Sequence, residues 1–243
     1  MTDDHPDVDD LDLTGWVVRE TVLDKSRFVG VVMRDVELDG LITNLTVNGV
    51  EVTAYVEAEL DRREPVRVLL RSDDLDDLRE AWMVLQAGWA VTTERLRRMG
   101  EGAAQTSVGG EWSAVQTLRH LVFVADAWLR GHVLDGPLAY HPLGLGASFM
   151  DGRQLGLDPD AHVTLDEVLA VNAERVDFVT RVLVAATPDT VGAPVRELPA
   201  GSFPAPQPGR TLLDCLHVVL NEEWAHHSFC VRDLDRLESG AAP

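Results

Sequence analysis

Four long segments of this chain repeat apolar residues at the spacing of an α-helix, and this pattern constrains the fold more than any other. In the first segment, about Asp73 to Met99, Leu78, Trp82 and Leu85 recur three or four positions apart. The other three segments are Ser113 to about Leu134, Thr164 to about Ala186, and Thr211 to about Glu238. Four amphipathic helices of this length predict a mainly α protein, with a four-helix bundle over residues 73–238.

The connections between these helices differ in length, and two of them are long. Ser113 and Thr164 each open a helix with the spacing of a capping box, which fixes where the preceding connection ends. The connections 135–163 and 187–210 are therefore crossover loops that exceed what a minimal bundle needs. We expect them to form walls of a substrate site, although loops of this length could equally serve only to carry the chain across the bundle.

The region before the bundle has a different composition. From Val29 to Val56 it is rich in Val, Thr, Leu and Gly, with turn signals at Asp39-Gly40 and Asn48-Gly49. This pattern predicts short strands, so residues 1–72 are expected to form an acidic tail followed by a small β-rich appendage.

Within the appendage, Phe28, Met33 and Leu38 recur every five residues. Three such steps resemble a short, degenerate pentapeptide-repeat stretch, and an ordinary small β appendage is the preferred alternative. Residues 1–12 are acidic and almost free of apolar side chains, which predicts disorder. Residues 239–243 are expected to be a short tail.

Charge and cysteine content limit the partners and the compartment. The chain has 41 acidic and 21 basic residues, and a formal charge of −20 repels nucleic acid and anionic membrane surfaces. No apolar run approaches the roughly 20 residues that span a bilayer. Cys215 and Cys230 lie too far apart on one helix to bridge each other, which favours reduced core thiols and a cytoplasmic protein.

Two carboxylates and two imidazoles lie together near the end of the last helix, in Glu222-Glu223-Trp224-Ala225-His226-His227. Burial of a lone carboxylate costs several kcal/mol, so ionisable groups on an apolar face favour a bound divalent metal ion. At about 100° per residue, Glu223 and His226 fall nearest the centre of the apolar stripe. Helical phase therefore favours Glu223 and His226 as ligands, with Glu222 and His227 as alternates.

A complete site needs a third ligand from another helix. His120 is the best candidate, because it lies in the apolar run of the second helix. Three His and Glu ligands leave one coordination position open, which is typical of a catalytic zinc and is compatible with nickel or iron. The alternative for the same residues is a purely structural role, in which they form a hydrogen-bonded network in the core without metal.

These residues together resemble the DinB-like superfamily of metal-binding four-helix proteins. The resemblance rests on Glu111-Trp112-Ser113, on Thr117-Leu118-Arg119-His120-Leu121, and on Asn221 to His227. The superfamily includes metal hydrolases of the YfiT type and mycothiol-dependent maleylpyruvate isomerases. The resemblance implies three metal ligands, one His from the second helix and two residues from the fourth. In the isomerase branch these ligands are His, Glu and His, and the Glu precedes the second His by four positions. The family spacing therefore pairs Glu222 with His226, or Glu223 with His227.

The resemblance implies a divalent-metal-dependent enzyme, with thiol-dependent transfer or isomerisation as the expected reaction. The metal would activate a low-molecular-weight thiol of the mycothiol kind, and the partner would be a small-molecule substrate. A metal-dependent hydrolase is one alternative. A non-catalytic binding protein, in which the appendage mediates self-association as a homodimer, is the other. No residue matches a known substrate motif, so catalytic residues are not assigned.

Overall fold

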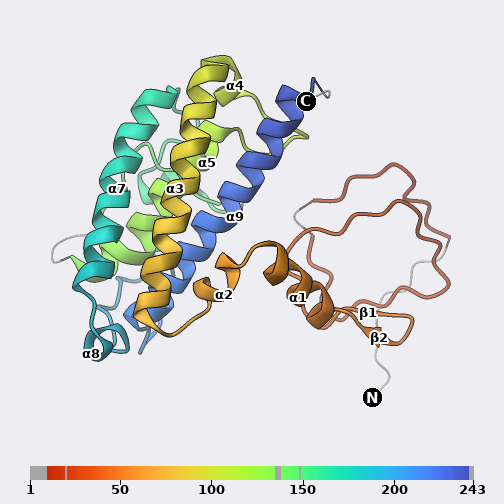
Figure 1. Ribbon diagram of the computed structural model, residues 1–243, viewed down its shortest axis with the longest axis horizontal. Helices are drawn as coiled ribbons and strands as arrows, with labels where there is room; N and C mark the ends of the chain where they lie inside the picture. Colours follow the sequence, from red (N-terminus) through yellow and green to blue (C-terminus); the bar gives the residue numbers. More distant parts are fainter. Residues whose placement is uncertain (1–9, 20, 135–137, 148, 241–243) are drawn as a thin grey trace. The chain divides into compact units, whose positions relative to one another are not determined.

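The computed structural model describes residues 10–19, 21–134, 138–147 and 149–240, and the bundle that it contains is mainly helical (Figure 1). The tail predicted to be disordered and the last three residues lie largely outside this part of the chain. The long helices are α3 (Leu75–Met99), α5 (Ala114–Ala125), α7 (Leu165–Ala185) and α9 (Leu212–Glu238). They confirm the predicted mainly α fold with its helical bundle.

The ends of these helices follow from local sequence. Ser113 caps α5 and Thr164 caps α7, each in the predicted capping box, and Thr211 caps α9 in the same way. Such caps satisfy backbone N–H groups that have no partner within the helix, at about 1 kcal/mol each. The second predicted helix continues beyond α5 through a π-helical turn, Asp126–Arg130, into α6 (Gly131–Val133).

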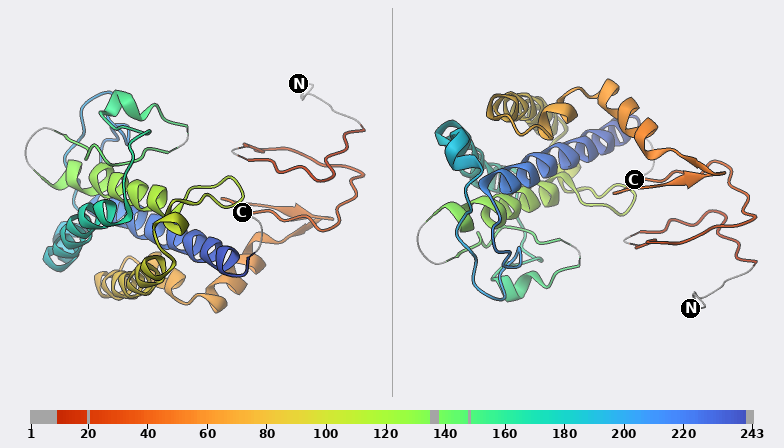
Figure 2. Two further views of the ribbon diagram at one scale, coloured as in Figure 1. Left: turned by 90° about the horizontal axis from the view of Figure 1, so that it is seen from above. Right: turned by 90° about the horizontal axis from the view of Figure 1, so that it is seen from below.

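The four long helices form a ring in which each packs on two others. Helix α9 packs on α3 and α5, and α7 completes the ring on their other side. Both views in Figure 2 show α9 between α3 and α5. The largest buried cluster draws on all four helices, with Leu78, Val124, Val179 and Leu216 among its members. Helix α9 therefore has two buried faces, one toward each neighbour.

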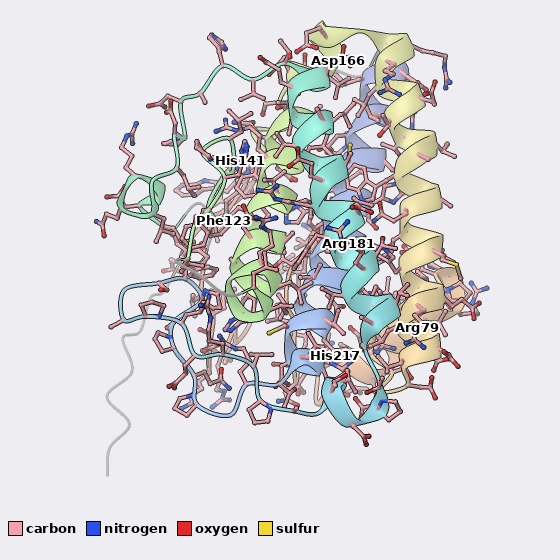
Figure 3. The ribbon with its side chains drawn as sticks, turned by 90° about the vertical axis from the view of Figure 1, so that its left-hand side faces the viewer. Arg79, Phe123, His141, Asp166, Arg181 and His217 are labelled. Carbon is pink, nitrogen blue, oxygen red and sulfur yellow. The ribbon has the colours of Figure 1, made fainter. Side chains whose placement is uncertain are left out.

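Short helices fill the connections of the bundle. They are α4 (Glu101–Gln105), the 3₁₀ turn Gly152–Leu155 and α8 (Pro188–Val191). At the foot of the bundle, Arg79 of α3 donates to the carbonyl oxygens of Leu183 and Ala186 at the end of α7. Figure 3 shows Arg79 beside this end of α7.

The two long loops meet over α5. The Tyr140 hydroxyl donates to the Phe203 carbonyl oxygen at 2.7 Å and accepts from the Phe203 amide at 3.0 Å, which joins the first loop to the second. Both rings pack against Phe123 of α5. The His141 amide donates to the buried Asp126 carboxylate, and Figure 3 shows the loop with His141 running beside Phe123. These contacts hold both loops on the bundle.

The chain divides into two units, Met1–Leu45 and Thr46–Pro243. The second unit begins with a hairpin of β1 (Thr46–Val47) and β2 (Val50–Glu51), whose turn is the predicted Asn48-Gly49. Helices α1 (Thr53–Arg63) and α2 (Val66–Leu70) follow.

The two-stranded hairpin agrees with the predicted small β-rich appendage, although its strands cover less of the stretch from Val29 to Val56 than the composition suggested. Among the described residues of this region, β structure is confined to the hairpin, and Thr53 already begins α1. The Val- and Thr-rich composition therefore does not translate into a sheet. Val and Thr favour strands only where a neighbouring strand or a packed face is available.

Candidate metal site

Helices α5 and α9 bring three ionisable side chains together at the face where they pack. His120 lies in α5, and Glu222 and His226 lie four residues apart on one face of α9. One Glu222 oxygen lies 3.4 Å from Nε2 of His120 and 3.1 Å from Nε2 of His226. One ligand atom from each of the three residues lies within 4.8 Å of the others.

The His120 ring is oriented by the first long loop. Its Nδ1 atom lies 3.0 Å from the Leu145 carbonyl oxygen, and the side chain is buried. A carbonyl oxygen can only accept, so Nδ1 carries a proton, and Nε2 is the ring atom directed toward Glu222 and His226. Histidines that bind metals commonly have their second nitrogen held in this way.

The neighbouring Arg119 fixes the loop that orients His120. Its buried guanidinium donates to the carbonyl oxygens of Leu143 and Asp158, at 2.8 and 2.5 Å. The Leu145 amide donates to the Arg119 carbonyl oxygen at 3.1 Å. Arg119 and His120 therefore act as a pair: one anchors the loop, and the other receives its orientation from that loop.

Aromatic rings cover the two histidines. The Trp112 ring lies 4.8 Å from the His120 ring and stacks on the His226 ring at 5.7 Å. Phe229, one turn further along α9, meets the edge of His226. Arg232 holds this cover in place, because it pairs with Glu111 at 2.5 Å and lies over the Phe229 ring. The rings limit water access to both imidazoles, while the Glu222 side chain stays 36% exposed and leaves an approach from solvent.

The two histidines determine the charge of Glu222. Burial by itself would raise the pKa of this carboxyl, but hydrogen bonds with His120 and His226 outweigh it and lower the pKa to about 2. Glu222 is therefore ionised at neutral pH. An anionic carboxylate beside the Nε2 atoms of two imidazoles is a set of side chains suited to a divalent cation, which would replace any proton on these nitrogens.

The next residue, Glu223, points to a different part of the protein. It is only 4% exposed, and burial raises its pKa to about 8 against weaker opposing effects of Trp89 and Gln86. The side-chain nitrogens of Trp89 and Gln86 are buried, and neither completes a hydrogen bond of ordinary geometry within the described residues. Glu223 therefore faces α3 as a neutral acid.

His227 faces α3 as well. Its Nε2 atom lies 2.9 Å from the Thr92 hydroxyl, and its ring meets the edge of Trp89 at 4.9 Å. Burial lowers the pKa of His227, which favours the neutral ring. Glu223 and His227 thus form a separate polar group between α9 and α3.

Of the five candidate residues, the structure brings together His120, His226 and the alternate Glu222. It places Glu223, which helical phase favoured, and His227 on the α3 side of α9. The reason is that α9 has two buried neighbours, so the centre of its apolar stripe does not coincide with the face toward α5. The Leu145 carbonyl and the Arg119 clamp have no sequence signal, because loop backbone atoms make these contacts.

The two separations that involve Glu222 fit a four-coordinate ion. Two ligand atoms that each lie about 2.0–2.2 Å from a tetrahedral centre are about 3.4 Å apart. The distances of 3.4 and 3.1 Å between the histidine nitrogens and Glu222 are close to this value. The ligand atoms of all three residues lie within 4.8 Å of one another, and two imidazoles with one carboxylate are donors that suit zinc, nickel or iron.

Comparisons with known proteins place the chain in one family. No match is found among curated proteins or among solved structures. Within the described residues, no helix is long and apolar enough to cross a membrane. A family model described as the DinB superfamily matches residues 84–230, which include the three converging side chains. Because this match covers more than half of the sequence, the chain belongs to the DinB superfamily.

Proposed function

We propose that this protein binds one divalent metal ion through Nε2 of His120, the Glu222 carboxylate and Nε2 of His226. The observation that carries the proposal is the convergence of these three groups, with His120 already oriented by the Leu145 carbonyl oxygen. A carboxylate held ionised between two imidazoles supports the same assignment. Zinc is the preferred ion, and nickel and iron suit the same donors.

We further propose that the site is catalytic and acts on a small molecule together with a low-molecular-weight thiol. When bound, the ion would supply Lewis acidity that lowers the pKa of a coordinated thiol or water. Three protein ligands leave a position for that group, and the exposed side of Glu222 provides the approach. The His, Glu, His order supports the thiol-dependent branch, transferase or isomerase, over a hydrolase.

The residues of the chain itself have defined roles in this proposal. Leu145 and Arg119 keep the His120 ring in one tautomer and one orientation. Trp112 and Phe229 exclude water from the two imidazoles, which strengthens every charge interaction in the site. The joined long loops, with Tyr140 and Phe203, are proposed to form the wall that contacts the substrate.

Metal analysis tests the proposal directly. Protein purified without chelator is expected to hold one equivalent of metal, and the stripped protein to rebind Zn²⁺ in a calorimetric titration. The variant His120→Ala should bind at least about 100-fold more weakly, since it removes one of three ligands. His162→Ala is the matched control, because His162 is an exposed loop histidine and its loss should change nothing.

Two results would count against this function. Absence of stoichiometric metal, together with equal Zn²⁺ affinity of wild type and His120→Ala, would leave a hydrogen-bonded network and the non-catalytic alternative. Turnover of activated esters or amides that is independent of added thiol would favour the hydrolase over the transferase. Assays of the metal-loaded protein with and without a small thiol separate these two reactions.

A further inference from the structure

The first unit bends at regular intervals along the chain. Backbone φ is positive at an almost unbroken five-residue interval among its described residues. These corners are Asp10, Gly15, Lys25, Gly30, Asp35, Gly40 and Asn44. Hydrogen bonds from the Trp16 amide to the Leu13 carbonyl and from the Ser26 amide to the Leu23 carbonyl close two of the turns. The unit is therefore a coil with sides of five residues.

An apolar residue recurs every five positions along most of this coil. It lies three residues after the corners Asp10, Gly15, Lys25, Gly30 and Asp35, and Leu23 continues the same five-residue period between them. The residues are Leu13, Val18, Leu23, Phe28, Met33 and Leu38. The structure thus extends the five-residue period of Phe28, Met33 and Leu38 by three further steps toward the N-terminus. A row of this regularity indicates one repeated packing role.

The first unit by itself leaves the apolar row exposed. Its six side chains are between 42% and 59% exposed, and fifteen large apolar side chains from Leu11 to Leu41 are each more than 40% exposed. Monomeric proteins rarely expose contiguous apolar patches beyond a few hundred Å². A coil of repeats buries its apolar row only when a neighbouring coil stacks on it.

The charge of the unit does not oppose self-association. Between residues 10 and 45 there are seven acidic and four basic side chains, whereas the whole chain has a formal charge of −20. Most of the repulsive charge therefore lies elsewhere. Two copies of this segment meet a much smaller electrostatic cost than two bundles would.

We propose that the coil is a self-association surface, on which the coil of a second copy of this chain stacks to form a homodimer. A second copy fits because it has the same five-residue side and the same apolar row, so its residues match in register. At roughly 100 Å² per half-exposed large side chain, about eight of the fifteen would supply the ~800 Å² per partner of a typical stable interface. A twofold arrangement closes the assembly at two copies.

Sedimentation equilibrium of the full-length protein tests this proposal. Wild type is expected to be dimeric at micromolar concentration. The double variant Phe28→Asp, Met33→Asp should be monomeric, because it places charge in the centre of the row. Phe28→Ala, which is milder, should raise the dimer dissociation constant at least about tenfold. Val91→Asp is the control, since Val91 is 69% exposed on α3, and it should stay dimeric.

The outcomes are distinct from those of the metal experiments. A wild type that is monomeric throughout this range would overturn the proposal, and would mean that the row is covered within the same chain. A dimer that persists in both Phe28 variants, or one that Val91→Asp dissociates, would place the interface on the bundle and overturn it too. Circular dichroism of each variant confirms that the bundle helices remain folded.

Discussion

Glu222 and Glu223 are adjacent in the sequence and lie on the same helix, yet their carboxyl groups are in opposite states. Glu222 lies between two imidazoles toward α5 and has a pKa of about 2. Glu223 lies against α3, where complete burial raises its pKa to about 8. One step of about 100° around the helix thus separates an ionised carboxylate from a neutral acid. Their partners, and not the residue type, determine their chemistry.

The same contrast holds for the two histidines. His226 stacks on Trp112 and contacts Glu222, whereas His227 contacts Thr92 and Trp89. The α5 side therefore gathers donors around a common point that a cation could occupy. On the α3 side, His227 contacts Thr92 and Trp89 of α3, while Glu223 is buried against the same helix, and within the described part of the chain the two do not converge on a common point with a third donor.

The largest expected effect comes from replacing each glutamate by its uncharged isostere. Glu222→Gln removes an anionic ligand and should weaken Zn²⁺ binding at least about 100-fold, or ~2.7 kcal/mol. Glu223→Gln should leave the affinity within about threefold of wild type. Calorimetric titration of the stripped proteins measures both. The opposite order would assign the ligand to Glu223 and exchange the roles of the two faces.

The second-largest expected effect is a pH dependence of the free energy of unfolding that comes from Glu223 on the α3 side of α9. Between pH 4.5 and about 8 the folded protein keeps a proton on Glu223 that the unfolded chain has released. The contribution of Glu223 to the free energy of unfolding should therefore be largest below pH 4.5 and fall as pH rises, by up to about 1.4 kcal/mol per unit. Glu223→Gln removes this contribution. Denaturant unfolding of the stripped proteins from pH 5 to 8 measures the difference between wild type and variant.

That difference is the informative quantity, because other groups titrate in the same range. Burial lowers the pKa of His227 in the folded protein. Below the ordinary pKa of histidine, the contribution of His227 to the free energy of unfolding therefore increases as pH rises, which opposes the contribution of Glu223. Both proteins share the His227 contribution, so it cancels. Parallel stability profiles for wild type and Glu223→Gln would show that Glu223 is ionised in the folded protein and would remove the contrast with Glu222.

The sequence predicts the positions of the four long helices better than it predicts which neighbouring helix each ionisable residue of α9 faces. Apolar periodicity and caps located the four long helices, and the isolated histidine in a buried run singled out His120 as a candidate. Phase favoured Glu223, whereas the structure places Glu222 beside His120, because phase indicates only that a residue is buried. It does not indicate which neighbouring helix the residue faces. That information depends on how α3 and α5 pack on α9, which is a tertiary property.

The N-terminal region was predicted less well for a related reason. A Val- and Thr-rich composition suggested strands, but the chain forms a coil with corners every five residues and then α1. Neither composition nor turn residues reveal whether a strand has a partner. The five-residue row was detectable in the sequence over three steps, and the corner positions were needed to recognise all six.

The smallest effect concerns how the α3 side accommodates His227. Gly88 of α3 faces this ring, and a Cβ at position 88 would lie 2.9 Å from Cε1 of His227. The ring cannot retreat without losing Thr92 and Trp89. Gly88→Ala should therefore lower the free energy of unfolding by about 1–2 kcal/mol, because overpacking outweighs the ~1 kcal/mol gain in helix propensity. Denaturant unfolding at neutral pH measures this change.

The control is the same substitution in a background without the ring. In His227→Ala the space beside position 88 is open, so Gly88→Ala should become stabilising by up to about 1 kcal/mol. Zn²⁺ affinity should stay within about threefold in all of these variants, since none of them touches His120, Glu222 or His226. An equal loss of stability in both backgrounds would show that His227 does not set the need for glycine. A loss of metal affinity in Gly88→Ala would instead show that the two sides of α9 are coupled, because a displacement of His227 would then reach His226 through the helix they share.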